Sequence, residues 1–298
     1  MRPNMAHGDS RQGILLALTA FLIWSCFPFY FKRLGAYEPL EIIVHRIVWT
    51  FVLLGVFLLA CRHWQGLALI KQQPKWLVYT AISGLLIAGN WLTYVWAVSH
   101  AQILAASLGY FISPLFGVAL SYFVLKEPLR PLQTLALGLA VLGVLVQLIL
   151  LGSIPVVAIA LAATFSVYGL MHRKTPLDSL TALFIETAIL APFGIMWLAN
   201  ANVASSQWGF WYSDAIFLLM LAGPVTLVPL LLYNKATKLV NFNTLSFMNY
   251  LTPSLIFLIA IGYYQEHFAW SHFAVFGLIW AGLGLFSWDM FWQQMRRR

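Results

Sequence analysis

Apolar residues dominate ten stretches of this chain, and short polar segments separate them. Each stretch has about the 20 residues that a helix needs to cross roughly 30 Å of hydrocarbon. A transmembrane barrel would instead alternate apolar and polar positions in segments of about ten residues. The pattern therefore predicts an all-α polytopic membrane protein with ten transmembrane helices, over residues 13–31, 42–61, 76–98, 103–125, 132–151, 154–171, 180–199, 215–233, 242–264 and 273–292.

The second half of the chain repeats rarer residue types of the first half at a constant offset of 139 residues. The matching pairs are Tyr94 with Tyr233, Pro114 with Pro253, Glu127 with Glu266, and Gly138 with Gly277. Because each repeat has an odd number of spans, the second copy enters the membrane from the opposite side, as in the inverted repeats of secondary transporters. We expect an N-terminal cytoplasmic segment, two five-helix repeats and a basic tail, over residues 1–12, 13–151, 152–292 and 293–298.

Helix-breaking prolines fall in equivalent spans of the two halves. Pro114 lies in the fourth span and Pro253 in the ninth, and the eighth contains Pro224 and Pro229. A proline inside a helix frees the carbonyl four residues before it, and such backbone is tolerated in a membrane only beside protein, a hydroxyl or water. We expect kinks at these prolines and a cavity lined by spans 3, 4, 8 and 9. The alternative is that the kinks serve packing alone.

Spans 5 and 10 are apolar almost throughout and carry glycines, Gly138 and Gly143 in one and Gly277 and Gly282 in the other. Small residues let membrane helices approach closely. We expect these two spans to be peripheral packing helices and a candidate homodimer face.

Positive charge is distributed unevenly about the predicted spans. The chain has 17 Lys and Arg residues and a net charge of +8. With the N-terminus in the cytoplasm, Lys32 and Arg33 lie outside, Arg46 lies within a span, and the other basic residues are cytoplasmic. The positive-inside rule therefore predicts an N-in, C-in topology. Membrane lipids with anionic headgroups account for the basic balance, so we expect no nucleic-acid partner.

Two charged residues lie inside the spans, Arg46 in the second and Glu186 in the seventh, at nearly equivalent positions of the two repeats. We expect no direct ion pair, because their depths would leave them roughly 12 Å apart along the membrane normal. A charge in the membrane is a functional hypothesis by default. Arg46 could instead reach the interface or pair with Glu38 or Glu41. Glu186 could carry a proton or be a neutral, hydrogen-bonded acid.

Aromatic, amide and hydroxyl side chains gather on several spans. Positions i, i+1 and i+4 share one side of a helix, which brings three candidates together on the third span. The candidate cavity residues are Trp24, Ser25, Asn90, Trp91, Tyr94, Tyr110, Ser113, Tyr168, Asn249, Tyr250 and Thr252. A lining rich in aromatics and hydroxyls and poor in charge suits an amphipathic or zwitterionic small-molecule solute. The alternative for each polar residue is an interhelical hydrogen bond.

The sequence contains no glycine-rich phosphate loop, HExxH motif or GxSxG motif. Cys26 and Cys61 lie in or beside apolar spans, so neither a disulfide framework nor a metal cluster is indicated. We therefore expect no catalytic residues, no cofactor and no metal.

Several long stretches resemble the drug/metabolite transporter superfamily, EamA type: EIIVHRIVW (41–49), GNWLTYVWAV (89–98), ASLGYFISPL (106–115), FSVYGL (165–170), LFIET (183–187) and LSFMNYLTPSLIF (245–257). The resemblance implies a multi-pass protein of the bacterial inner membrane with a central cavity between spans 1, 3, 4, 6, 8 and 9. It also implies that Arg46 matches an arginine that recurs in the second span of these repeats. The family has Gly before the Glu that follows spans 4 and 9, where this chain has Lys126 and Gln265.

We predict a secondary transporter that exports an amphipathic metabolite, an amino acid or a drug such as chloramphenicol by alternating access of its two repeats. The competing interpretations are a passive channel and a non-transporting structural membrane protein. A channel should carry a continuous polar stripe on several helices, which the sequence does not show. A membrane enzyme is disfavoured for want of a catalytic constellation.

Overall fold

A computed structural model describes residues 7–62, 65–100, 103–151, 156–212, 215–265 and 270–296. Over these ranges the regular structure is helical, with no strand. Within the described residues, nine helical segments are long and apolar enough to cross a membrane, and a shorter apolar helix covers Leu108–Phe123. The prediction of an all-helical polytopic membrane protein is therefore confirmed.

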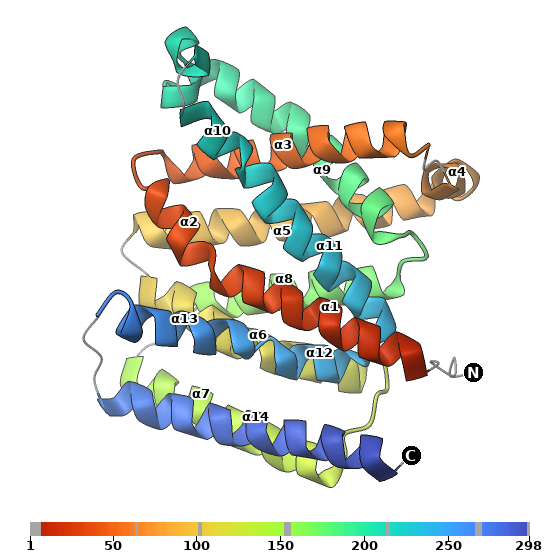
Figure 1. Ribbon diagram of the computed structural model, residues 1–298, viewed down its shortest axis with the longest axis vertical. Helices are drawn as coiled ribbons and strands as arrows, with labels where there is room; N and C mark the ends of the chain where they lie inside the picture. Colours follow the sequence, from red (N-terminus) through yellow and green to blue (C-terminus); the bar gives the residue numbers. More distant parts are fainter. Residues whose placement is uncertain are drawn as a thin grey trace.

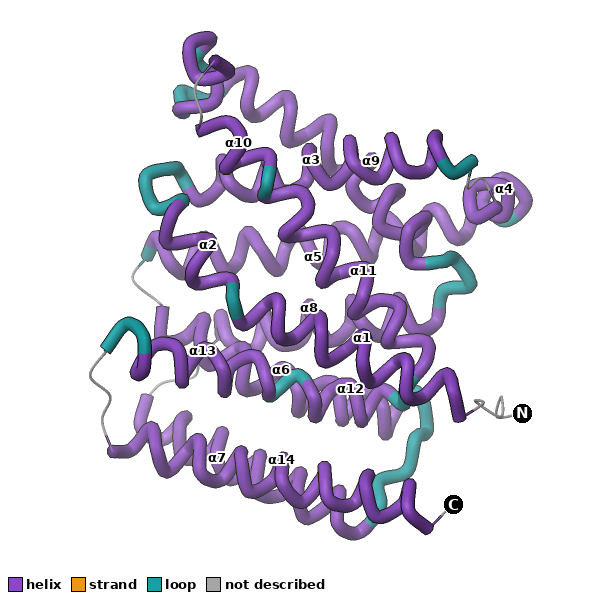
Figure 2. The backbone as a smooth tube through the Cα atoms, viewed as in Figure 1, coloured by secondary structure: helices purple, strands orange, loops and turns teal. Residues whose placement is uncertain are grey.

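The helices follow the predicted spans closely, and short loops join most of them (Figure 2). The first half contains α1 (His7–Ser25), α2 (Phe27–Arg33), α3 (Pro39–Ala60), α4 (Gln65–Gln72), α5 (Lys75–Ser99), α6 (Ile103–Phe123) and α7 (Pro131–Leu151). The second half contains α8 (Val156–Lys174), α9 (Ser179–Asn200), the 3₁₀ turns η1 (Ala204–Ser206) and η2 (Trp208–Tyr212), α10 (Ala215–Met220), α11 (Ala222–Leu239), α12 (Phe242–Met248), α13 (Leu251–Gly262) and α14 (Trp270–Arg296).

Three of the predicted spans are each divided into two helices. The first divides at Cys26, the eighth at Leu221 and the ninth at Asn249–Tyr250. Pro224 and Pro253 each lie three residues into the helix that follows a break. The first turn of a helix has no intrahelical acceptor for its N–H groups, so a proline there removes no hydrogen bond.

The other two expected kinks do not interrupt a helix. α6 continues through Pro114, and α11 continues through Pro229. The fourth span is therefore one helix where its repeat partner, the ninth, is two. The break at Cys26, just before Pro28 of α2, was not expected from the sequence.

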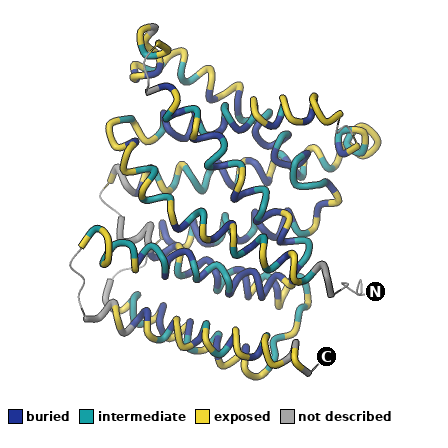
Figure 3. The backbone as a smooth tube through the Cα atoms, in the orientation of Figure 1, coloured by how far each residue is buried: buried dark blue, intermediate teal, exposed yellow. Residues whose placement is uncertain are grey.

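The helices pack side by side, with α7 and α14 together at one edge of the molecule and α3 and α9 toward the opposite edge (Figure 1). Both labelled termini lie on the same side of the bundle in that view. Buried residues concentrate in the middle of the bundle (Figure 3). The main core contains Phe21, Tyr168, Tyr233 and Phe242. Many large apolar side chains on the outside are exposed, as expected where lipid replaces water.

Close approach of α7 and α14 depends on glycines. A Cβ atom on Gly143 would lie 3.2 Å from Ile279 Cγ1, and one on Gly282 would lie 2.8 Å from the carbonyl oxygen of Ala136. The two peripheral spans thus pack on each other through small residues. Gly138 and Gly277 have no atom of the described chain within 4 Å of such a Cβ, and the homodimer face remains a prediction.

Candidate functional site

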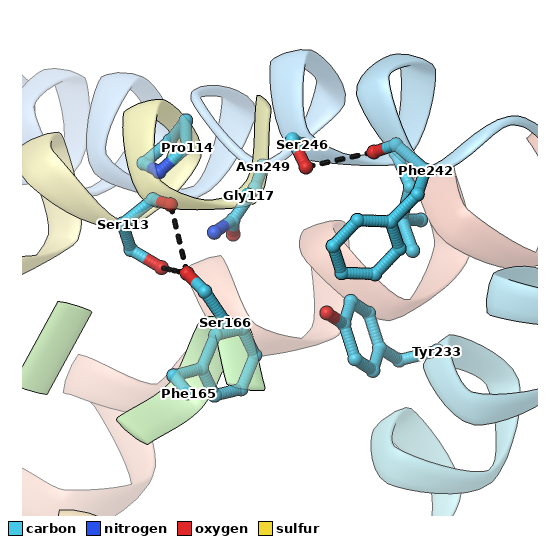
Figure 4. A pocket seen from close by; sticks show the side chains of 10 residues that line it. Ser113, Pro114, Gly117, Phe165, Ser166, Tyr233, Phe242, Ser246 and Asn249 are labelled. Atoms are coloured by element: carbon cyan, nitrogen blue, oxygen red, sulfur yellow. Dashed lines mark hydrogen bonds between the residues drawn. The ribbon is translucent and has the colours of Figure 1, made fainter. Parts of the chain in front are cut away.

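A small pocket lies where helices of the two halves meet (Figure 4). Its lining residues are Ser113, Pro114, Gly117, Phe165, Ser166, Tyr233, Phe242, Leu245, Ser246 and Asn249. The free space between these side chains holds about one water molecule, so the pocket is too small for a solute. Three predicted site residues line it: Ser113, Pro114 and Asn249.

Two hydroxyls in the pocket wall already donate to backbone carbonyls of the protein. Ser166 of α8 donates to the carbonyl oxygen of Ser113 in α6 at 3.0 Å, and the two hydroxyl oxygens are 3.4 Å apart. Ser246 of α12 donates to the carbonyl of Phe242 at 2.7 Å, as Figure 4 shows. A Cβ on Gly117 would lie 2.8 Å from the Cβ of Ser246, so α6 and α12 are in close contact here. The helices around this pocket are therefore packed tightly together.

An aromatic cluster backs the pocket. The ring centre of Trp24 lies 5.8 Å from the ring centre of Phe165 and 5.5 Å from that of Tyr233. Phe165 and Tyr233 both line the pocket. The nearby hydroxyls of Ser25 and Thr252 both donate to the carbonyl of Phe21, at 2.7 and 3.4 Å. Trp24 is thus close to the pocket, whereas the two hydroxyls predicted with it serve the backbone.

Two further predicted cavity residues, Asn90 and Tyr250, do not line the pocket. The amide of Asn90 in α5 donates to the carbonyl of Leu161 at 2.8 Å and to the hydroxyl of Thr164 at 2.9 Å, both in α8. Tyr250 is 1% exposed, packs against Phe247, and has no hydrogen-bond partner for its hydroxyl within the described chain. The interhelical hydrogen bond is therefore present for Asn90, whereas Tyr250 is buried in the packing without one in the described chain.

Arg46 lies among aromatic side chains rather than acids. Its Nε donates to the hydroxyl of Thr226 in α11 at 2.8 Å. The guanidinium carbon is 4.3 Å from the ring centre of Trp91 and 5.6 Å from that of Phe31. Among the described residues, no carboxylate oxygen lies within 4.0 Å of a guanidinium nitrogen of Arg46. Glu41, one of the expected partners, instead accepts a hydrogen bond from the backbone N–H of Ser205 at 2.7 Å.

Three tyrosines lie close enough to Arg46 to interact with it electrostatically: Tyr30, Tyr94 and Tyr110. The rings of Tyr94 in α5 and Tyr110 in α6 meet edge to face, with centres 6.3 Å apart. They are 40% and 45% exposed. The structure thus brings four of the sequence candidates together, and two of them are partly exposed. The four are Arg46, Trp91, Tyr94 and Tyr110.

Glu186 has the opposite environment. Its Oε1 accepts from Ser83 at 2.6 Å and lies 2.8 Å from Nε2 of His172, and its Oε2 accepts from Tyr168 at 3.4 Å. Asn234 donates to the Tyr168 hydroxyl at 2.8 Å. All five residues are at most 2% exposed. Tyr168 was predicted as a cavity residue and belongs to this buried network.

Sequence reasoning missed three members of that network, Ser83, His172 and Asn234. The available signal was the spacing of Tyr168 and His172, which are four residues apart and share one face of α8. As expected, Arg46 and Glu186 do not form an ion pair with each other within the described chain.

Glu127 joins several helix ends at the same end of the bundle as this network. Its carboxylate accepts from the backbone N–H groups of Phe242 and Asn243 at 2.8 and 3.3 Å, which caps the N-terminus of α12. It also pairs with Arg173 at 3.2 Å, and Arg173 is the chain neighbour of His172. Its repeat partner, Glu266, lies outside the described residues.

The turn before Glu127 keeps a glycine-like conformation without glycine. Lys126 has φ of 57°, and Gln265, at the equivalent position of the second half, has φ of 53°. Residues other than glycine adopt this left-handed region at a cost of about 1 kcal/mol or more. The tight turn is therefore present at both positions despite the departure from the family pattern.

Comparisons with known proteins give one consistent picture. The EamA-like transporter family model matches residues 11–149. The chain is 45% identical to an uncharacterized transporter of Pseudomonas aeruginosa, over 98% of both chains. It is 40% identical to "Protein RarD" of Escherichia coli, over 97% of this chain and 98% of that one.

A more distant relative and one solved structure extend these matches. "Chloramphenicol-sensitive protein RarD" of Pseudomonas aeruginosa is 26% identical over 94% of this chain and 95% of its own. A protein crystal structure aligns with a TM-score of 0.67 at 21% identity, covering 92% of this chain and 96% of that one. The latter likeness concerns the fold alone.

Proposed function

The chain belongs to the EamA-like transporter family, and on that premise we propose that it is a secondary transporter that exports a small amphipathic solute by alternating access. It is a multi-pass protein of the bacterial inner membrane, and its family is one of transporters rather than enzymes. The observation that carries the mechanism is a difference along the bundle. Polar contacts of Glu127, Arg173 and Glu186 join the helices at one end, whereas partly exposed aromatic side chains lie beside Arg46 farther along.

Helix contacts support two repeats that face one another. If α1 corresponds to α8, α5 to α10 and α11, and α6 to α12 and α13, then the contact of α1 with α11 corresponds to that of α5 with α8. Likewise, the contact of α1 with α13 corresponds to that of α6 with α8. The pairs α3 with α9 and α7 with α14 correspond to themselves. Such exchange symmetry is what inverted repeats produce.

The closed end involves both halves. Glu127 and Arg173 tie the end of α6 to α8 and α12, and Arg173 also donates to the carbonyls of Thr237 and Val240. The Glu186 network lies at the same end and joins α5, α8, α9 and α11. Tyr94 lies eleven residues along α5 from Ser83, roughly 16 Å by the helical rise.

The distribution of basic residues favours placing the closed end in the cytoplasm, with both termini there as well. The start of α1 and the end of α14 lie on the same side of the bundle in Figure 1, which supports this placement. We propose that this arrangement is the state open toward the outside. Rocking of one repeat against the other would open the cytoplasmic end by separating the Glu127 and Arg173 contacts.

The solute we propose is a small amphipathic molecule, such as an amino acid, another metabolite or a drug like chloramphenicol. The support for chloramphenicol is the name of one relative, the chloramphenicol-sensitive protein RarD of Pseudomonas aeruginosa. A passive channel and a structural protein remain the alternatives. A homodimer through α7 and α14 is a further part of the proposal.

Counterflow in proteoliposomes tests the proposal. Vesicles are preloaded with an unlabelled amino acid or chloramphenicol, and uptake of the same labelled solute is followed with and without a pH gradient. A transporter gives transient accumulation of at least one solute above protein-free vesicles. A channel would give equilibration without accumulation, and a structural protein would give no movement, so either result would reject the proposal.

Cysteine labelling tests the inverted orientation. Cys26 and Cys61 are first replaced by Ser, and single cysteines are then placed at Arg62 and Ala201, which are 139 residues apart after α3 and α9. A membrane-impermeant maleimide added outside spheroplasts should label Ala201→Cys and leave Arg62→Cys unlabelled. Labelling of both from the same side would contradict the inversion.

A further inference from the structure

We infer that Arg46 is the anion-binding point of the solute site, and that the solute is a monocarboxylate whose apolar body lies against Trp91, Tyr94 and Tyr110. This inference rests on the proposed transport function and names the substrate class. It narrows the solute from amphipathic molecules in general to those that carry a carboxylate.

The first argument is that the guanidinium of Arg46 has no negatively charged partner among the described residues. Of the guanidinium nitrogens, Nε donates to Thr226, whereas the two terminal nitrogens have no hydrogen-bond partner in the described chain. Arg46 as a whole is only partly buried. A charge at membrane depth without a counter-ion is costly, and membrane arginines are usually paired. A carboxylate arriving with the solute would supply the partner.

The second argument is the geometry of the aromatic contacts. The guanidinium carbon lies 4.3 Å from the ring centre of Trp91, a cation–π contact. Such a contact is electrostatic and does not require an N–H group to donate a hydrogen bond to an acceptor. A planar fork of N–H donors matches the two oxygens of a carboxylate, which it can bind through two parallel hydrogen bonds.

The third argument is what surrounds the free N–H groups. Tyr94 and Tyr110 lie near the guanidinium and keep 40% and 45% of their surface accessible. They offer aromatic faces for an apolar body. Tyr30 is already engaged, because its hydroxyl donates to the carbonyl of Leu218 at 2.8 Å.

The charge balance of the site selects against cations. No acid of the described chain lies within 4.0 Å of Arg46, and the acids named as its alternative partners do not contact it. A solute amine would therefore meet an uncompensated positive charge. A neutral amide of the same shape would lose the charge-assisted hydrogen bonds, which are about twice as strong as neutral ones.

Equilibrium dialysis of the purified full-length chain in detergent tests the inference with three probes of one shape: radiolabelled 3-phenylpropionate, 3-phenylpropionamide and 3-phenylpropylamine. We expect the carboxylate to bind at least tenfold more tightly than the amide, and the amine to bind more weakly than either. Arg46→Gln should remove the preference for the carboxylate. Arg46→Lys should retain part of it, because the charge remains without the planar fork.

The matched control is Arg33→Gln, which removes one positive charge from an exposed residue at the end of α2 and should bind like the unaltered chain. Equal binding of carboxylate and amide, no binding of the carboxylate, or an undiminished preference in a folded Arg46→Gln variant would each overturn the inference. Binding does not require transport, so such a result leaves the transport proposal to the counterflow assay. Absence of counterflow with a preserved carboxylate preference would reject transport alone.

Discussion

Arg46 and Glu186 occupy nearly equivalent positions of the two halves, yet their surroundings differ in every respect that matters to a charge. Glu186 is 2% exposed and touches three hydrogen-bonding side chains. Arg46 has one hydrogen bond, an aromatic contact and accessible surface beside it. Sequence position alone gives no hint of this difference.

The comparison teaches that an ionisable residue in a membrane can serve two purposes. A charge whose partners are all supplied by the protein joins helices, and the helices around Glu186 come from both halves. A charge whose partner is missing leaves that position for a solute. We therefore propose that the Glu186 network serves stability and that Arg46 serves recognition, and the following predictions compare the two.

The largest expected effect is on stability at the network. Glu186→Ala leaves His172, Ser83 and Tyr168 buried without their shared acceptor. Each buried donor that is left without an acceptor costs about 1 to 3 kcal/mol. Unfolding of the purified protein in detergent by increasing denaturant should show a loss of this size. Glu38→Ala, at an exposed acid before α3, should change stability by less than about 0.5 kcal/mol. Similar values for the two variants would refute the structural role.

The next effect is on recognition, at Arg46. Arg46→Gln should lower initial counterflow of a carboxylate solute at least tenfold, equivalent to about 1.4 kcal/mol. Its loss of stability should be less than half that of Glu186→Ala, because it removes one hydrogen bond and relieves an unpaired charge. The proposal would be contradicted if Arg46→Gln lost as much stability as Glu186→Ala while transport per folded molecule stayed constant. Arg46 would then have the structural role, and not the role in recognition.

Substitutions at two glycines of α5, Gly84 and Gly89, allow the packing beside Glu186 to be compared with the packing farther along the same helix. A Cβ on Gly84 would lie 3.3 Å from the Cα, Cβ and Cγ atoms of Glu186, whereas one on Gly89 would meet nothing of the described chain within 4 Å. Gly84→Ala should destabilise the protein by about 1 kcal/mol through overpacking. Gly89→Ala should leave stability unchanged or raise it by up to about 1 kcal/mol. Denaturant unfolding measures both, and the reverse order would mean that the network is loosely packed.

The smallest effect concerns the hydroxyl that positions Arg46. Thr226→Val removes the acceptor of the Nε–H group while keeping the side-chain shape. We expect carboxylate binding about threefold weaker, or about 0.7 kcal/mol, within the range of one net hydrogen bond. Thr226→Ser keeps the hydroxyl and should restore binding in the dialysis assay. Failure of Ser to restore what Val removes would show that the hydrogen bond does not position Arg46.

Hydropathy predicted the helical spans because a helix in lipid must be apolar over a fixed length. It could not predict the break at Cys26, since the preceding residues are as apolar as any other span. Glycine placement correctly indicated the close packing of α7 and α14, through Gly143 and Gly282. These are local properties, and local sequence is enough to reveal them.

The site was harder to predict because lipid and protein interior are equally apolar, so the pattern along a helix does not tell which face looks inward. Tyr110 and Tyr250 looked alike in sequence, yet one is 45% and the other 1% exposed. The hydrogen-bond partners could not be predicted either, because they are far apart in the sequence. Arg46 and Thr226 are separated by 180 residues, and Ser83 and Glu186 by 103. Only the three-dimensional arrangement reveals which charge is satisfied.

The most direct test of this division of roles is the shift in melting temperature that a saturating carboxylate produces in three chains. A ligand that binds only the folded state raises the free energy of unfolding by RT ln(1 + L/Kd), where L is the free ligand concentration, so a chain that does not bind it shows no shift. We predict that 3-phenylpropionate, and not its amide, raises the melting temperature of the unaltered chain and of the less stable Glu186→Gln variant, and leaves that of Arg46→Gln unchanged. A shift in Arg46→Gln as large as in the unaltered chain would contradict the account.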